Sequence, residues 1–395
     1  MTEKILIINA GSSSIKFKVY DYELLTEIAS GLCERIFVDG FIKIKYNTDL
    51  VWEQNIDMPN HDKAIKIVLE TLLSLKVIED LNEIVGVGHR VVQGGTEYDK
   101  STIIHEKDIE KIDKYSKLAP LHNKPELDVV KIFQKQIPGA KNVAIFDTSF
   151  HTTIPQLNYD YCLDRETTKK YGIKRYGYHG TSYRYINQKM EEILGKKELN
   201  LVVCHLGNGA SICAIKDGNS YNTSMGLTPL EGLVMGTRCG DIDGATALYL
   251  QRQGLSINEV ENEFNKKGGL KGLCGYSDGR DVDAKIKEGN KLAIMAREIQ
   301  IQRIADYIVK YINQLENKVD AIIFTAGIGE NDRTLTVEVS NKIFTHKIDI
   351  EPNKVNEKYN DYILMTTKNS DIAVYKVRTN EELMMAIDTK NLIAK

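Results

Sequence analysis

The sequence predicts a mixed α/β protein made of two related domains. An apolar run, a glycine- and serine-rich turn and a second, alternating apolar run follow one another near the start of the chain, as in a β-hairpin. The same layout returns near the middle of the chain, and amphipathic helical patterns lie between the two copies. The repeat indicates an internal duplication, and strands interleaved with helices indicate the α/β class.

The two hairpins are predicted over Lys4–Tyr20 and Leu199–Lys216, with turns at Asn9–Ser14 and Leu206–Ala210. Glycine and serine dominate turns in any protein, and Asn-Gly is a favoured hairpin pair. The same residues also offer backbone N–H groups and hydroxyls to a phosphate, and Lys16 adds a cation. Each segment alone fits an ordinary turn, whereas their repetition favours contact with phosphate.

Apolar residues spaced three and four positions apart predict three helices. These helices cover His61–Lys76, Glu126–Gln136 and Lys291–Glu316. Buried strands are expected over Asn142–Phe146 and Val319–Thr325, and a third glycine-rich segment, Gly327–Asn331, follows the second of them. Loops after buried strands of α/β sheets often contact ligands. The segment matches neither a P-loop nor a dinucleotide-binding fingerprint.

The composition fits a large globular protein and excludes some partners. A chain of 395 residues, 42% hydrophobic and 27% charged, is long enough for more than one domain. Its net charge of -3 gives no reason to expect a nucleic-acid partner. The apolar runs are far shorter than the roughly 20 residues of a membrane span, and the start of the chain lacks a signal-peptide core. Six cysteines without a C-x-x-C pair predict reduced thiols in a cytoplasm.

Arg90 and Arg238 stand among small and apolar residues, where an unpaired guanidinium is costly to bury. Each arginine therefore needs an anion. One interpretation is an internal salt bridge to a carboxylate such as Asp241 or Asp243. The other is that both arginines face a substrate carboxylate and a phosphoryl group.

His179 and Asp147 are further candidates with two interpretations each. His179 fits a core histidine, but Gly177 and Gly180 on either side favour an exposed tight segment that brings the imidazole to a ligand. Asp147 follows a predicted strand and fits either a turn or helix cap formed with Thr148, or a carboxylate near phosphate and metal.

The end of the chain carries a T-x-x-E pattern that predicts a capping box from Thr379 to Glu382, opening the last helix. Glu381 has no part in this cap. It is either a solvated acid of the first turn or a Mg²⁺ ligand. Ser277–Asp281 reads most simply as a polar turn.

The stretch Arg175–Ser182 and the three glycine-rich segments, taken together in this order along the chain, resemble the acetate kinase family. This family lies within the superfamily of sugar kinases, heat-shock ATPases and actin. The resemblance extends from Asn9 to Glu381. It implies two duplicated actin- or ribonuclease-H-like domains, each a mixed five-stranded sheet flanked by helices, with a cleft between them. It also implies an N-terminal lobe, residues 1–149 plus 383–395, with the phosphate hairpin and part of the acyl site. Residues 150–382 would form a C-terminal lobe for nucleotide binding and dimerisation.

The resemblance implies reversible in-line transfer of the ATP γ-phosphoryl group to acetate, giving acetyl phosphate and ADP. Mg²⁺, or alternatively Mn²⁺, would be the metal, and the protein would be a cytoplasmic homodimer without nucleic-acid or membrane partners. One alternative is a kinase for propionate or another short-chain acid. A more distant alternative is an ATP-driven conformational protein of the same superfamily.

The resemblance also implies roles for individual residues. The catalytic group would be Asp147, His179 and Arg238. The acetate would contact Arg90, Val92, Leu121, Tyr178 and Pro229. The nucleotide would contact Ser12, Ser14, Lys16, His205, Leu206, Gly207, Asn208, Gly209, Asp278, Gly279, Arg280, Gly327, Ile328, Gly329, Glu330 and Asn331. The metal would be held by Asn9 and Glu381.

Four positions depart from the pattern that is usual in this family. Tyr178 stands where phenylalanine is usual, Tyr183 where histidine is usual, Cys239 where serine is usual and Gly244 where proline is usual. The phenol of Tyr178 bears on the choice between acetate and propionate. Tyr183 affects a secondary histidine contact.

Overall fold

The computed structural model describes residues 2–47, 50–119 and 122–394. The chain forms two compact units, one of Met1–Ser149 with Asn380–Lys395 and one of Phe150–Thr379. The last helix, which begins at Glu381, belongs to the first of these units.

The first unit contains a mixed sheet of eight strands among the described residues, in the order β5-β4-β3-β2-β1-β6-β8-β7. The strands are β1 (Lys4–Ala10), β2 (Ile15–Asp21), β3 (Glu27–Glu34), β4 (Phe41–Tyr46), β5 (Leu50–Asn55), β6 (Ile84–Val91), β7 (Thr102–Ile103) and β8 (Lys141–Phe146). β1 and β2 form the predicted antiparallel hairpin, whereas β6 runs parallel to both β1 and β8. The first hairpin prediction is therefore confirmed.

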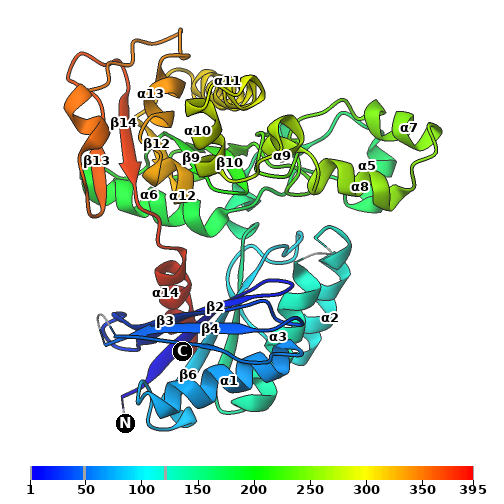
Figure 1. The fold of residues 1–395 in the computed structure, drawn as a ribbon, viewed down its shortest axis with the longest axis vertical. Helices are drawn as coiled ribbons and strands as arrows, with labels where there is room; N and C mark the ends of the chain where they lie inside the picture. The colour runs from blue at the N-terminus through cyan, green and yellow to red at the C-terminus, as the bar shows by residue number, and fades with distance from the viewer. Residues whose placement is uncertain (1, 48–49, 120–121, 395) are drawn as a thin grey trace. The chain divides into compact units, whose positions relative to one another are not determined.

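Helices cover both faces of this sheet (Figure 1). They are α1 (His61–Ser74), α2 (Glu106–Lys114), α3 (Asn123–Gln136) and α14 (Glu381–Ile393), with short 3₁₀ turns at Leu81–Glu83 and Tyr115–Lys117. Helix α14 lies on the face opposite α1 and α3. It packs closely because β6 carries Gly88, where an added Cβ would lie 2.5 Å from Oγ1 of Thr389. This contact holds the second half of α14 against β6, the strand that carries Arg90.

The second unit contains a mixed sheet of six strands, in the order β11-β10-β9-β12-β14-β13. The strands are β9 (Leu201–Leu206), β10 (Ala210–Lys216), β11 (Asn219–Thr223), β12 (Ala321–Thr325), β13 (Tyr362–Leu364) and β14 (Ala373–Val377). β9 and β10 form the second predicted hairpin, and β12 runs parallel to β9 and β14.

The two sheets share a five-stranded core. In the first unit this core is β3-β2-β1-β6-β8, and in the second it is β11-β10-β9-β12-β14, with the same order and the same strand directions. The predicted duplication is confirmed. The expected count of five strands is too small for the whole sheets, because β4, β5 and β7 extend the first core and β13 extends the second.

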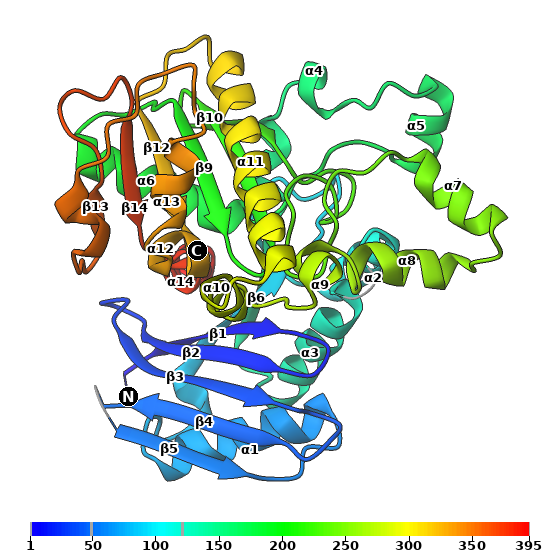
Figure 2. The same ribbon diagram turned by 45° about the horizontal axis from the view of Figure 1, so that its top comes forward.

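The helices of the second unit include the long helix α11 (Lys291–Gln314), which matches the predicted pattern, and α6 (Gly180–Leu194). Figure 2 shows α11 crossing the sheet, and α6 packs on the sheet through Tyr183, Ile186 and Met190. The other helices are α4 (Gln156–Tyr159), α5 (Arg165–Tyr171), α7 (Ala245–Arg252), α8 (Ile257–Asn265), α9 (Gly269–Cys274), α10 (Gly279–Lys287), α12 (Ala326–Asn331) and α13 (Leu335–Ser340), with 3₁₀ turns at Ser149–Thr153 and Pro352–Asn356.

The predicted capping box at Thr379 is wrong. Asn380 caps α14, and its side chain accepts a hydrogen bond from the backbone N–H of Leu383. Thr379 is engaged elsewhere in the second unit, because its hydroxyl lies 2.9 Å from that of Ser182 and its N–H donates to the carboxylate of Glu330. Asparagine is at least as good a helix cap as threonine, so Asn380 caps the helix in place of Thr379.

The six cysteines are all free thiols. Within the described part of the chain, no helix combines the length and the apolar character needed to cross a membrane.

Candidate active site

Arg90 and Asp147 form an ion pair in the first unit. They lie at the carboxyl ends of the neighbouring parallel strands β6 and β8, whose register brings Arg90 beside Ile145 and Val91 beside Phe146. Nε and Nη2 of Arg90 donate to the Asp147 carboxylate at 3.0 and 2.7 Å. Asp147 is 2% exposed, whereas the Arg90 side chain is 22% exposed. Asp147 takes two of the three guanidinium nitrogens, so Nη1 is the nitrogen through which Arg90 can reach a second anion.

This pairing corrects one expectation. The internal acid of Arg90 is Asp147 and neither Asp241 nor Asp243. Asp147 and Thr148 lie in a turn directly after β8, as one interpretation expected, but the Asp147 carboxylate binds Arg90. The hydroxyl of Thr148 accepts a hydrogen bond from the distant N–H of Gly94, at 3.1 Å.

Two further carboxylates surround Arg90. Glu126 of α3 is buried and accepts the N–H of Val92 at 3.0 Å, and burial raises its pKa to about 8. Burial also raises the pKa of Glu381 to about 7, against the attraction of Arg90. The raised pKa keeps Glu126 largely protonated near neutral pH, whereas a bound cation would favour the ionised form of Glu381.

Glu126 is not among the site residues predicted from the sequence. A signal was available, because Glu126 stands three and four positions before Val129 and Val130 and so lies on the apolar face of α3. An acidic residue on the apolar face of a helix indicates a buried carboxylate that is hydrogen-bonded to a partner, here the N–H of Val92.

Asn9 and Lys16 lie opposite each other in the β1–β2 pair. Both line a cavity of about 270 Å³ that also includes Glu382 of α14. The Asn9 amide oxygen and the Glu381 carboxylate are hard oxygen donors of the kind that Mg²⁺ prefers, and Mg²⁺ commonly takes only one or two protein ligands. These two donors therefore fit Mg²⁺. In the described ranges no three His, Cys, Asp or Glu side chains gather into a metal cluster.

The turn between β1 and β2 is closed by a hydrogen bond from the N–H of Gly11 to the carbonyl of Ser14, at 2.8 Å. Ser12 and Lys16 are exposed, and Ser14 is partly buried. The turn interpretation is thus confirmed, and the phosphate contacts of these residues stay a prediction.

In the second unit, His179 caps α6 with a left-handed backbone, φ 60°. This conformation is uncommon for a residue with a side chain and often occurs at functional sites. Nδ1 of His179 lies 2.8 Å from the hydroxyl of Ser211, and its ring stacks on that of His205, with centroids 4.1 Å apart. The sequence analysis placed both histidines in the site, and the structure brings them into contact.

Arg238 lies beside His179 at the tip of the second hairpin. A Cβ added at Gly209 would lie 3.4 Å from Nη1 of Arg238 and 3.8 Å from Nε2 of His179. Nη1 also donates to the carbonyl of Pro229 at 3.0 Å. The glycine thus keeps the space in front of both groups open. Gly236 is needed for the same hairpin, because a Cβ there would lie 2.0 Å from Oδ1 of Asn208.

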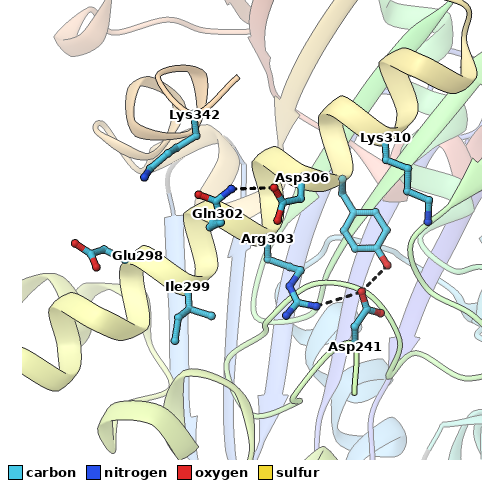
Figure 3. Close-up of a pocket in the computed structure, with 9 residues that line it drawn as sticks. Asp241, Glu298, Ile299, Gln302, Arg303, Asp306, Lys310 and Lys342 are labelled. Carbon is cyan, nitrogen blue, oxygen red and sulfur yellow. Dashed lines mark hydrogen bonds and ion pairs between the residues drawn. The ribbon is translucent and has the colours of Figure 1, made fainter. Parts of the chain in front are cut away.

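Asp241 does not pair with Arg238. Its carboxylate accepts hydrogen bonds from Tyr307 at 2.8 Å and from Arg303 at 3.4 Å. Both partners belong to α11 and line, with Asp241, a cavity of about 640 Å³ (Figure 3). Apart from Asp241, none of the candidate site residues named from the sequence lines this cavity.

Asp278 is a helix cap, which refines the expected polar turn. It caps α10 by accepting the N–H of Arg280, and it also binds the Arg280 guanidinium at 2.6 Å. The hydrogen bonds from Arg280 lower the pKa of Asp278 to about 2. The pair lies at the surface, and nucleotide contact at Asp278, Gly279 and Arg280 stays a prediction.

The third glycine-rich segment is a short helix, α12, and not a loop. Gly327 at its first turn has open space around it, whereas Gly329 allows the helix to approach Phe324 closely. Glu330 has a structural role, because its carboxylate accepts the N–H groups of Ala326 and Thr379 at 2.9 and 3.0 Å. The nucleotide contacts predicted for this segment are untested.

The residues expected around the substrate methyl group belong to both units. Val92 is buried in the first unit. Tyr178 is buried in the second, where its hydroxyl donates to the carbonyl of Leu227 at 2.8 Å. Pro229 also lies in the second unit, and Leu121 lies outside the described residues. The pocket stays a prediction.

The family model described as the acetokinase family matches residues 4–387. The chain belongs to the acetokinase family. Among curated members of this family, an acetate kinase from Mycoplasmoides gallisepticum is 51% identical over 390 residues, covering 98% of this chain and 99% of the relative. The family resemblance drawn from the sequence is confirmed.

Solved structures of the acetokinase family have the same fold. The acetate kinase of Porphyromonas gingivalis is 35% identical, covers 99% of both chains and superposes with a TM-score of 0.91. A propionate kinase from Francisella tularensis is 37% identical, covers 99% of this chain and 100% of that one, and superposes with a TM-score of 0.93. The actin-like fold class is therefore confirmed.

Proposed function

We propose that this protein is an acyl-phosphate-forming kinase that transfers the γ-phosphoryl group of ATP reversibly to acetate. The observation that carries this proposal is the proximity of Arg238 and His179 at the tip of a glycine hairpin. Backbone amides, a guanidinium and an imidazole together suit a phosphoryl group in transfer. The 51% identity to an acetate kinase supports acetate as the acceptor.

The chemistry explains why these residue types are present. A carboxylic acid with a pKa of roughly 4 is already ionised at neutral pH, so acetate needs no strong general base to attack phosphorus. The obstacle is charge, because an anion approaches a polyanion and the transferring group spreads negative charge over its oxygens. Arg90 would bind the acetate carboxylate through Nη1, and Asp147 would hold Arg90 in place. Arg238 and His179 would stabilise the charge on the phosphoryl group.

Mg²⁺, with Mn²⁺ as the alternative, would be held by Asn9 and Glu381 and would supply charge neutralisation for the phosphates. The carboxyl groups near Arg90 support a cation there, because a cation would stabilise their ionised forms. The nucleotide would be contacted by the second hairpin and by Gly327 of α12.

Glu381→Gln should raise the Mg²⁺ concentration needed for half-maximal activity by at least about tenfold, because the variant loses a charged oxygen ligand. Titrating activity with Mg²⁺ measures this shift. Glu382→Gln is the matched control, since Glu382 is the next residue of α14 and pairs at 3.8 Å with Lys18. Equal Mg²⁺ requirements in both variants would remove Glu381 from the metal site.

The reaction is tested by trapping acyl phosphate as its hydroxamate, with ATP, Mg²⁺ and acids of two, three and four carbons. The proposal predicts product with acetate and the highest kcat/KM for it. The propionate kinase among the structural relatives supports the alternative of a three-carbon acceptor. One methylene is worth about 1–3 kcal/mol, so some turnover of propionate is expected. ATP hydrolysis without any acid dependence would support the conformational ATPase instead.

We further propose that the protein forms a homodimer through the exposed apolar side chains of α7 and the exposed Tyr171 of α5. Neither helix has a buried residue, and Leu248 and Tyr249 of α7 are 53% and 58% exposed. Figure 1 shows α5, α7 and α8 together at one end of the second unit. Exposed apolar surface of this kind is typical of an interface.

The free thiols support a reducing, cytoplasmic location.

Leu248→Asp should convert the dimer to a monomer, because a carboxylate in an apolar interface loses its hydration. Size-exclusion chromatography with light scattering measures the mass. Phe344→Asp is the control, since Phe344 is 82% exposed but lies outside α5 and α7. A wild-type protein that elutes as a monomer contradicts the proposed dimer.

A further inference from the structure

Tyr183 is connected to His179 through one hydroxyl. Tyr183 lies on α6 and is fully buried. Its hydroxyl is hydrogen-bonded to that of Ser211, which is also fully buried and lies 2.8 Å from Nδ1 of His179. The three side chains come from α6, β10 and the cap of α6 and form one continuous chain of hydrogen bonds.

The bond at Nδ1 determines what the other nitrogen of the ring can do. A neutral imidazole carries one hydrogen, and the partner of Nδ1 decides whether that hydrogen lies on Nδ1 or Nε2. Nε2 is the nitrogen that faces the Gly209 position beside Arg238. To donate to a phosphoryl oxygen, Nε2 must carry the hydrogen.

The surroundings favour the neutral ring with its hydrogen on Nε2. The positive charge of Arg238 disfavours a protonated, positively charged His179 beside it. Because the rings of His179 and His205 stack, protonation of both histidines is also disfavoured. Burial raises the pKa of the Tyr183 phenol well above its usual range, so the hydroxyl keeps its hydrogen. When Tyr183 donates to Ser211, the single hydrogen of Ser211 is directed at Nδ1 of His179.

We propose that Tyr183 is a positioning residue for His179: acting through Ser211, its hydroxyl keeps the ring in the tautomer whose Nε2–H faces the transferring phosphoryl group. The expected effect on turnover rests on the proposed function. The position of the ring hydrogen of His179 does not depend on that function. Histidine, which is usual here in the family, can donate to Ser211 through a ring N–H, whereas phenylalanine cannot.

Tyr183→Phe should lower kcat about tenfold, which corresponds to the loss of about 1.4 kcal/mol of transition-state stabilisation, and leave KM for acetate and ATP nearly unchanged. Tyr183→His should recover part of the loss. The matched control is Tyr375→Phe, because Tyr375 belongs to the same apolar cluster and loses the same hydroxyl. Thermal unfolding of each variant shows whether the fold is kept.

Nitrogen-15 NMR of histidine-labelled protein reads the tautomer directly, with His179→Asn identifying the signal. The wild type should show Nε2–H, and Tyr183→Phe should show a mixture of tautomers. A wild-type ring with its hydrogen on Nδ1, an unchanged tautomer in Tyr183→Phe, or an unchanged kcat in that variant each overturns the proposal. If the wild type makes no acyl phosphate, the proposed function fails while the NMR result still decides the tautomer.

Discussion

Arg238→Ala should lower kcat at least about 100-fold, because it removes one preorganised charge contact to the phosphoryl group in transfer. The fold should survive. The guanidinium is partly exposed and donates to a backbone carbonyl, that of Pro229, at 3.0 Å. Steady-state kinetics in the acyl phosphate assay measure the loss, and the circular dichroism spectrum reports the fold.

Arg333→Ala is the control for Arg238→Ala. Arg333 is exposed in the same unit, before α13, and a surface change there should alter stability and turnover little. Near-normal turnover in Arg238→Ala would exclude the guanidinium from the transition state. Arg238→Lys should recover only part of the activity, since a lysine lacks the planar fork.

Arg90→Ala should lose both turnover and stability, and the two losses can be separated. Turnover should fall at least about 100-fold through the loss of the acetate contact. Stability should fall by about 3–5 kcal/mol, because Asp147 is left as a buried carboxylate without its partner. Denaturant unfolding and kinetics on the same preparation measure the two effects.

The double variant Arg90→Ala/Asp147→Asn tests this separation. It removes the buried charge, so most of the lost stability should return while turnover stays low. Recovery of turnover together with stability would mean that Arg90 acts through folding alone. Failure of stability to return would mean that the Arg90–Asp147 ion pair does not account for the loss.

Sequence patterns were sufficient for the parts of this protein that depend on local chemistry. Both hairpins, α1, α3 and α11 follow from apolar periodicity and from Gly-Ser turns, and they lie where the patterns indicate. Residues expected at the catalytic and acetate sites also gather within each unit, Arg90 with Asp147 and His179 with Arg238.

The errors concern partners that are distant in sequence. Arg90 and Asp147 are joined by the register of two parallel strands, which no local pattern encodes. The cap of α14 is decided between two adjacent residues by the contact of Thr379 with Ser182, 197 positions away. The segment Gly327–Asn331 was expected as a loop, and its helix is stabilised by the bond from Thr379 to Glu330.

The most direct measurement is a crystal structure with ADP, Mg²⁺, aluminium fluoride and acetate, in which the fluoride stands for the phosphoryl group in transfer. The account predicts that Nη1 of Arg238 and Nε2 of His179 contact the fluoride, and that Arg90 binds the acetate carboxylate while still paired with Asp147. A fluoride group that touches neither Arg238 nor His179, or an acetate bound away from Arg90, would contradict the claim that these side chains neutralise the charge of the reaction.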